Sequence, residues 1–124
     1  MEAINIQPTD ETPGITLDKT SQQLRMWGNS LPEDVTVFFE PVLQWLEHYK
    51  SAPNQATVFD FNMTYFNTAS SKIILDILTE LEDLSMSGQE VLVKWSFRED
   101  DEEMEEAGEE YSEIVEVPFK LIAT

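Results

Sequence analysis

Strand-like segments alternate with helix-like segments along most of this chain, and this alternation is the strongest constraint on its fold. Helices packed against a sheet with mostly parallel strands are the usual result of such an order. We therefore expect an α/β fold: a single-layer mixed sheet, largely parallel, with packed helices and an opening β-hairpin. The expected strands are residues 15–19, 23–27, 56–62, 90–97 and 115–122, and the expected helices are residues 33–50, 70–86 and one within the acidic segment 98–110.

The last three expected strands differ in their patterns. Residues 56–62 are apolar on both sides of Asp60, which indicates a central strand buried on both faces. A proline interrupts residues 115–122 at Pro118, which favours an edge strand or a bulge. The strand at 90–97 alternates, so that one face is formed by Val91, Val93, Trp95 and Phe97.

The first expected helix, residues 33–50, carries its apolar side chains on one stripe. Residues 28–32 are expected to form the turn before it. Pro41 either kinks this helix or marks its real first turn. His48 is the only histidine in the sequence, and no serine or cysteine motif accompanies it. A catalytic triad or a histidine metal site is therefore not expected.

The length of 124 residues fits one domain. Residues 1–13 are polar and are expected to be a flexible N-terminal arm, which leaves residues 14–124 as a single domain. Cysteine is absent, which excludes disulfides and thiolate chemistry. No apolar run approaches the roughly 20 residues needed to cross a bilayer, and the start of the chain lacks the pattern of a signal peptide. We therefore expect a cytoplasmic protein with no membrane insertion.

The formal net charge is −18, which disfavours direct binding to nucleic acid or to an anionic membrane. Nine acidic residues lie between positions 99 and 110. We interpret them as the solvated face of a helix whose Met104 and Ala107 point inward. The spacing does not match a calcium loop, and no glycine-rich phosphate loop occurs. Neither a metal nor a cofactor is expected, and the segment is a better candidate for docking a basic partner.

The most informative segment is residues 65–72, which lie between the strand at 56–62 and the body of the helix that follows it. One interpretation is a helix cap, because asparagine and threonine oxygens accept hydrogen bonds from the first free N–H groups of a helix. The other is a phosphorylation site with Thr68 as the acceptor and Ser70 and Ser71 as alternatives, since such corners are exposed. Backbone N–H groups and the helix dipole would favour a phosphate there. The two interpretations are compatible, and the candidate contacts of a phosphate or a partner are Tyr65, Asn67, Ser70, Ser71 and Lys72.

Because the sequence contains no recognisable catalytic motif, we expect a binding or switch protein and not an enzyme. The acidic charge also leaves open a mimic of nucleic acid, or another kind of interaction module.

Several short sequence motifs of this chain resemble those of the SiaC family of bacterial regulatory phosphoproteins. The resemblance covers nearly all of the chain from Thr12 onward, with the short motifs in the same order and at similar spacing. These motifs are Ser30-Leu31-Pro32-Glu33-Asp34, Phe39-Glu40-Pro41-Val42-Leu43-Gln44-Trp45-Leu46, Tyr65-Phe66-Asn67-Thr68-Ala69-Ser70-Ser71-Lys72, Val93-Lys94-Trp95, Glu106-Ala107-Gly108-Glu109 and Val117-Pro118-Phe119.

The resemblance implies a fold related to STAS-type anti-sigma-factor antagonists and a partner-switching role. It implies that Thr68 is phosphorylated by a kinase of the SiaB type and dephosphorylated by a PPM-type phosphatase of the SiaA type. It further implies that the unphosphorylated form binds and activates a diguanylate cyclase of the SiaD type. Cyclic di-GMP would then rise and promote aggregation and biofilm formation.

Overall fold

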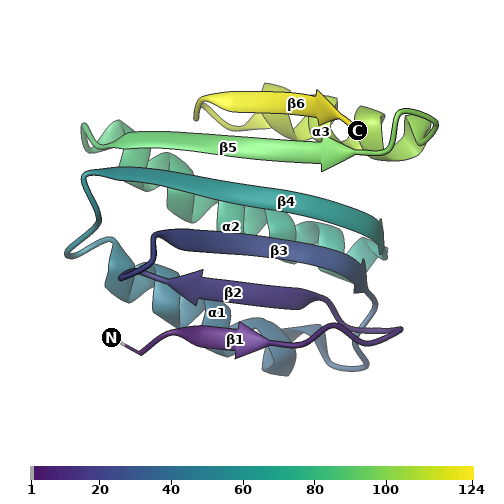
Figure 1. Cartoon of the computed structure of the whole chain (residues 1–124), viewed down its shortest axis with the longest axis horizontal. Coiled ribbons are helices and arrows are strands. Elements are labelled where there is room, and N and C mark those ends of the chain that lie inside the picture. Colours follow the sequence, from purple (N-terminus) through teal and green to yellow (C-terminus); the bar gives the residue numbers. More distant parts are fainter. Residues whose placement is uncertain (1) are drawn as a thin grey trace.

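Six strands form one sheet, and three helices cover it, in the computed structural model, which describes residues 2–124 (Figure 1). The first residue of the predicted arm lies outside the described residues. None of the helices within residues 2–124 is both long and apolar enough to cross a membrane. The elements are β1 (Ile4–Ile6), β2 (Gly14–Asp18), β3 (Gln23–Ser30), α1 (Val35–Tyr49), β4 (Ala56–Phe66), α2 (Thr68–Met86), β5 (Glu90–Phe97), α3 (Glu102–Ile114) and β6 (Phe119–Ala123).

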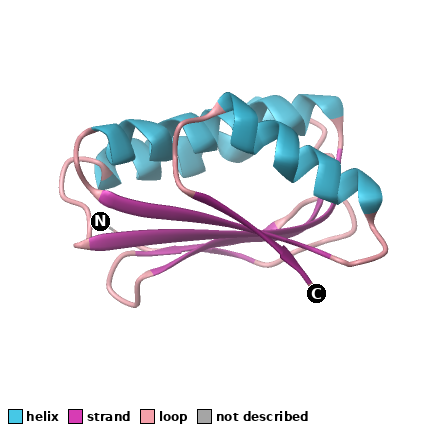
Figure 2. Ribbon diagram, turned by 90° about the horizontal axis from the view of Figure 1, so that it is seen from above, coloured by secondary structure: helices cyan, strands magenta, loops and turns pink. Residues whose placement is uncertain are grey.

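The strands lie side by side in the order in which the chain makes them, from β1 to β6. The first two pairings are antiparallel, and the pairings β3–β4, β4–β5 and β5–β6 are parallel. Right-handed crossovers that always advance in the same direction place their helices on one face of the sheet. Figure 2 shows the helices as one layer and leaves the other face of the sheet uncovered. The predicted mixed, largely parallel sheet with its opening hairpin is confirmed.

Strand β1 lies within the segment that was predicted to be a flexible arm, residues 1–13. It pairs with β2 in the register from Ile4 opposite Leu17 to Ile6 opposite Ile15. Both isoleucines of β1 pack against the core. The prediction of an arm is therefore wrong for these residues, because the pairing with β2 orders a strand too short to give a local signal.

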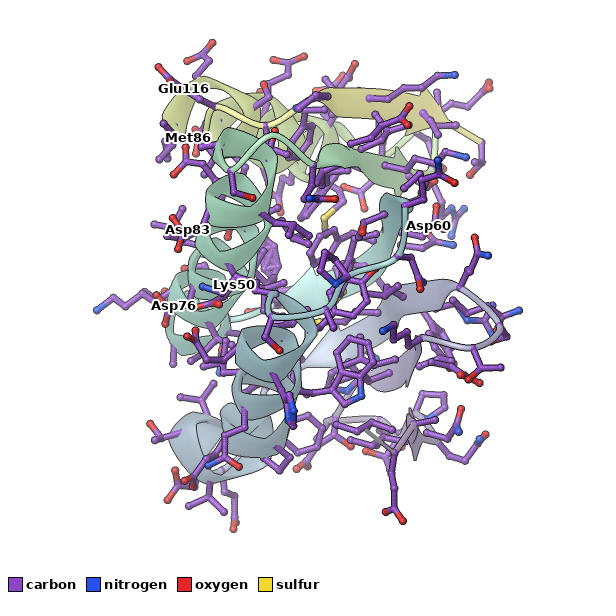
Figure 3. The ribbon with its side chains drawn as sticks, turned by 90° about the vertical axis from the view of Figure 1, so that its left-hand side faces the viewer. Lys50, Asp60, Asp76, Asp83, Met86 and Glu116 are labelled. Carbon is purple, nitrogen blue, oxygen red and sulfur yellow. The ribbon has the colours of Figure 1, made fainter. Side chains whose placement is uncertain are left out.

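Strand β4 is longer than predicted and is buried on one face only. Phe59 and Phe61 lie in the core, whereas Asp60 is exposed. Figure 3 shows Asp60 on the side of the sheet away from the helices. The prediction of burial on both faces is wrong because no helix covers that side. Val58 belongs to the uncovered face, where it lies opposite Leu92 of β5 and is half-buried.

Strand β3 includes residues 28–30, which were predicted to belong to a turn at residues 28–32. It ends at Ser30, and its pairing with β4 shifts register between Gly28 and Asn29. Gly28 has a φ of 93°, a left-handed conformation that glycine adopts without steric cost. The turn prediction is wrong because this bulge lets a glycine-containing segment remain in the sheet.

Helix α1 begins after Asp34, whose side chain accepts a hydrogen bond from the backbone N–H of Val37 at 3.1 Å. Pro41 lies inside this helix and does not mark its start. The last strand is shorter than predicted, since β6 begins only after Pro118. It lies at the edge of the sheet, as the proline indicated.

Helix α3 is held against the sheet through Trp95 of β5. This side chain is fully buried, and its indole N–H donates a hydrogen bond to the backbone oxygen of Met104 at 3.0 Å. A Cβ atom on Gly108 would lie 2.5 Å from the Trp95 ring. Only a glycine therefore lets the helix approach the indole this closely.

Helices α1 and α2 are joined at one end by Lys50, which follows α1 (Figure 3). Its ammonium lies 2.8 Å from a carboxylate oxygen of Glu80 and 3.4 Å from Asp83, both on α2, and 3.1 Å from Glu47. Burial raises the pKa of the Glu80 carboxyl, whereas the hydrogen bond from Lys50 lowers the pKa of Glu47. The cluster fixes the two helices beside each other.

Candidate functional site

The predicted phosphorylation segment forms the corner between β4 and α2. Asn67 is the N-cap of α2, and its side-chain oxygen accepts a hydrogen bond from the N–H of Ser70 at 2.9 Å. Its backbone oxygen accepts the N–H of Ser71, also at 2.9 Å. Thr68 is therefore the first residue of the helix. The helix-cap interpretation is confirmed for Asn67.

A buried pair of serines fastens this corner to the end of β3. The hydroxyl of Ser70 donates to the backbone oxygen of Ser30 at 2.9 Å, and the two hydroxyl oxygens are 2.8 Å apart. The backbone oxygen of Ser30 also accepts the N–H of Asn67 at 3.1 Å. Both serines are fully buried. Unpaired polar groups would be costly there, so the pair fixes where α2 begins.

The three hydroxyl side chains of the segment have different surroundings. Ser70 is fully buried, so the prediction that it contacts a phosphate or a partner is wrong. Ser71 is half-buried, and its hydroxyl donates to the backbone oxygen of Thr68 at 2.6 Å. The Thr68 side chain is exposed, and its hydroxyl makes no hydrogen bond within residues 2–124. Thr68 is therefore the most accessible of the three hydroxyls.

Hydrogen-bond donors and exposed side chains surround the Thr68 hydroxyl. Within the described residues, the backbone N–H groups of Thr68 and Ala69 have no hydrogen-bond partner, as is usual at a helix start. Lys72 is exposed and follows Thr68 by four residues, so it shares the same side of α2. Tyr65, at the end of β4, is 51% exposed. The corner therefore presents two free backbone N–H donors and a lysine ammonium beside one free hydroxyl.

Tyr111 of α3 supports the corner from the other side. Its phenolic hydroxyl donates to the backbone oxygen of Ser71 at 2.8 Å. Burial, reinforced by the nearby carboxylate of Glu110, raises the pKa of Tyr111 above its ordinary value. The first turn of α2 is thus linked to α3 by a hydrogen bond that exists only while Tyr111 is neutral.

This linkage predicts a loss of stability at alkaline pH. Because the pKa of Tyr111 is higher in the folded state, its contribution is complete below about pH 10 and is lost as the pH rises through the folded value. Tyr111→Phe should cost about 1 kcal/mol at pH 8, from the lost hydrogen bond. Urea unfolding should show the difference between the two proteins falling above about pH 10, by up to about 1.4 kcal/mol per pH unit, and then changing sign. A difference that stays constant to pH 11 would contradict this role.

The acidic segment supplies the start of α3. Asp101 is its N-cap and accepts the N–H of Met104 at 3.1 Å. Met104 is buried and Ala107 packs against the core, so the predicted inward orientation of these two residues is confirmed. Among residues 2–124, no three histidine or carboxylate side chains are arranged to hold a metal ion. The strand order also never reverses, and such reversals are where open α/β sheets bind nucleotide cofactors.

Sequence reasoning missed two residues that hold the corner, Ser30 and Tyr111. Each forms its hydrogen bond across 40 positions of the chain, to Ser70 and Ser71 respectively. No local pattern reveals such contacts. The only indication in the sequence was that Ser30 begins one of the motifs shared with the SiaC family.

Comparison with known proteins gives the same result by sequence and by structure. The family model described as SiaC family regulatory phosphoprotein matches residues 6–124. An uncharacterized protein of Pseudomonas aeruginosa strain UCBPP-PA14 is 32% identical over 99% of this chain and 98% of its own length. The crystal structure of apo-SiaC from Pseudomonas aeruginosa aligns with a TM-score of 0.89 and 31% identity over 99% of this chain and 100% of that one.

A second similar structure is a complex. It contains the diguanylate cyclase SiaD with its activator SiaC, from Pseudomonas aeruginosa. The chain matched there has a TM-score of 0.90 and 33% identity, over 98% of this chain and 99% of that one. The resemblance noted in the sequence is confirmed: this chain belongs to the SiaC family of regulatory phosphoproteins.

Proposed function

We propose that this protein is a non-enzymatic phospho-switch of the cytoplasm that acts through Thr68. A kinase of the SiaB type adds a phosphoryl group to Thr68, and a PPM-type phosphatase of the SiaA type removes it. The unphosphorylated form binds and activates a diguanylate cyclase of the SiaD type, which raises cyclic di-GMP and promotes aggregation and biofilm formation. The activator role of SiaC in the Pseudomonas aeruginosa complex supports this assignment.

One observation carries the proposal: Thr68 presents an exposed hydroxyl on a rigidly held helix start. Transfer of a phosphoryl group to its Oγ1 would place roughly −1.5 to −2 charge beside the free N–H groups of the first turn. These donors and Lys72 can stabilise that charge without moving the backbone. A partner packed on this corner would meet a small neutral hydroxyl in one state and a hydrated dianion in the other.

Intact-mass spectrometry after incubation with the cognate kinase and ATP tests the acceptor. The unaltered protein should gain one phosphoryl group, and Thr68→Ala should gain none. Ser71→Ala is the matched control, because it removes a neighbouring hydroxyl of the same turn, and it should be phosphorylated like the unaltered protein. A phosphoryl group on Thr68→Ala would show that Thr68 is not the sole acceptor.

A nucleic-acid mimic is the alternative that the charge of −18 suggested. We do not favour it. A mimic of nucleic acid would need an extended, purely charged surface, whereas the acidic residues of α3 lie beside an apolar surface. The relation to STAS-type antagonists and the absence of nucleic-acid partners remain predictions.

A further inference from the structure

A groove extends from the start of α3 to the space between α2 and α3. It consists of three depressions of about 760, 230 and 290 Å³. The first two share Thr64, Asp101 and Glu103, and the last two share Phe66 and Ala107. We call this feature the α3 groove. Thr68 does not line the groove, but Phe66, two residues before it, and Ser71 and Lys72 of the same first turns of α2 do.

The floor of the α3 groove is apolar where it passes between α2 and α3. Leu75 and Ala107 line this part, with Ile114 at its far end. Ile114 is 60% exposed, and Tyr65, which lines the middle depression, is 51% exposed. Large apolar side chains exposed along one groove are typical of a surface that a partner covers.

The rim of the α3 groove is acidic. Five carboxylate side chains line it, and only two cationic side chains do, Arg98 and Lys72. The guanidinium of Arg98 lies 3.4 Å from one of these carboxylates, Asp100, which leaves the balance strongly negative. The acidic lining residues are Asp100, Asp101, Glu102, Glu103 and Glu110. Charge complementarity therefore selects a basic occupant.

We propose that the α3 groove receives a segment of the diguanylate cyclase rich in lysine and arginine, with one apolar side chain seated between Leu75 and Ile114. This inference rests on the proposed function and adds the contact surface and the chemistry of the partner. The carboxylates of the rim accelerate association, and the apolar floor supplies the contacts that slow dissociation.

Phosphorylation of Thr68 must oppose a partner that negative charge attracts, and the magnitudes show how it does so. One phosphate changes a net charge of −18 by roughly 2 units, so the long-range attraction changes by about a tenth. Packing a partner side chain against the phosphate would instead remove part of the hydration of a dianion, a much larger local cost. Phosphorylation should therefore act mainly on dissociation, and salt mainly on association.

Surface plasmon resonance with the cognate diguanylate cyclase tests the inference. For the unmodified protein, the association rate constant should fall about tenfold or more between about 50 and 300 mM NaCl. The double variant Glu103→Gln/Glu110→Gln should bind about tenfold more weakly at low salt. The matched control Glu40→Gln/Glu90→Gln makes the same change in net charge at exposed positions outside the groove, and it should bind almost normally.

A second pair of variants tests the apolar floor. Ile114→Ser should weaken binding about tenfold with little change in thermal stability, because the side chain is mostly exposed. Met86→Ser is the matched control, since Met86 is 68% exposed and does not line the groove. Normal binding by both groove variants would overturn this inference and leave the phospho-switch intact. Failure of the unmodified protein to bind the cyclase would overturn both proposals.

Discussion

Protein phosphorylated on Thr68 is expected to bind the diguanylate cyclase at least about a hundredfold more weakly than the unmodified protein. A hundredfold change corresponds to about 2.7 kcal/mol of binding free energy. The reason is local: the Thr68 side chain is exposed on a corner fixed by Ser30, Ser70 and Tyr111, so the phosphate cannot be turned into the interior. A partner must displace water from the dianion or leave a gap at its own interface.

Isothermal titration of the cyclase with both forms measures this change. The phosphorylated form is made with the cognate kinase, and phosphatase treatment should restore the original affinity. Thr68→Ala carried through the same reactions is the control, because it keeps the corner but cannot accept the phosphoryl group. Equal affinity of the phosphorylated and unmodified forms would refute the switch, whatever the identity of the kinase.

Trp95→Ala is expected to lower the free energy of unfolding by about 4 kcal/mol. The indole is fully buried between the sheet and α3, with ring centroids 5.3 Å from Phe61 and 5.5 Å from Tyr111. Its removal would leave a large cavity and would also strip the backbone oxygen of Met104 of its donor. Urea denaturation followed by circular dichroism measures the loss.

Two other variants separate the causes of that loss. Trp95→Phe keeps an aromatic ring but loses the indole N–H, so it should cost about 1–2 kcal/mol. Trp27→Ala removes a tryptophan that is half-buried on the uncovered face of the sheet, where Arg25 lies 4.5 Å from its ring, and it should cost about 1 kcal/mol. Similar losses for Trp27→Ala and Trp95→Ala would contradict the role of Trp95 in anchoring α3.

Local patterns predicted most elements of the fold, and the failures share one cause. Residues 90–97 alternate clearly, and β5 has those bounds. Strand β4 was assigned to the wrong environment because Val58 made its pattern continuous, although the number of covered faces depends on where three helices lie. Strand β1 has only three residues and exists through its pairing with β2. Tertiary contacts decided both cases, and a short window of sequence does not contain them.

The candidate site shows the same division. Asn67 caps α2 through a neighbour three residues away, which is a local interaction that its position revealed. The burial of Ser70 could not be predicted in this way, since its partner Ser30 lies at the end of β3, 40 residues earlier in the chain. Sequence therefore predicted a hydroxyl-rich helix start, whereas the fold determined which hydroxyl faces the solvent.

The burial of Ser70 also limits how many hydroxyl groups at this corner a kinase can phosphorylate. A kinase that reaches the first turn of α2 finds one free hydroxyl, since Ser70 is inaccessible and the neighbouring Ser71 hydroxyl is already bonded to the backbone. Modification of Ser70 would require local unfolding of the end of β3. If Thr68 is the acceptor, as we propose, each molecule has only two states at this turn, and a graded cellular output must come from the fraction of molecules in each state.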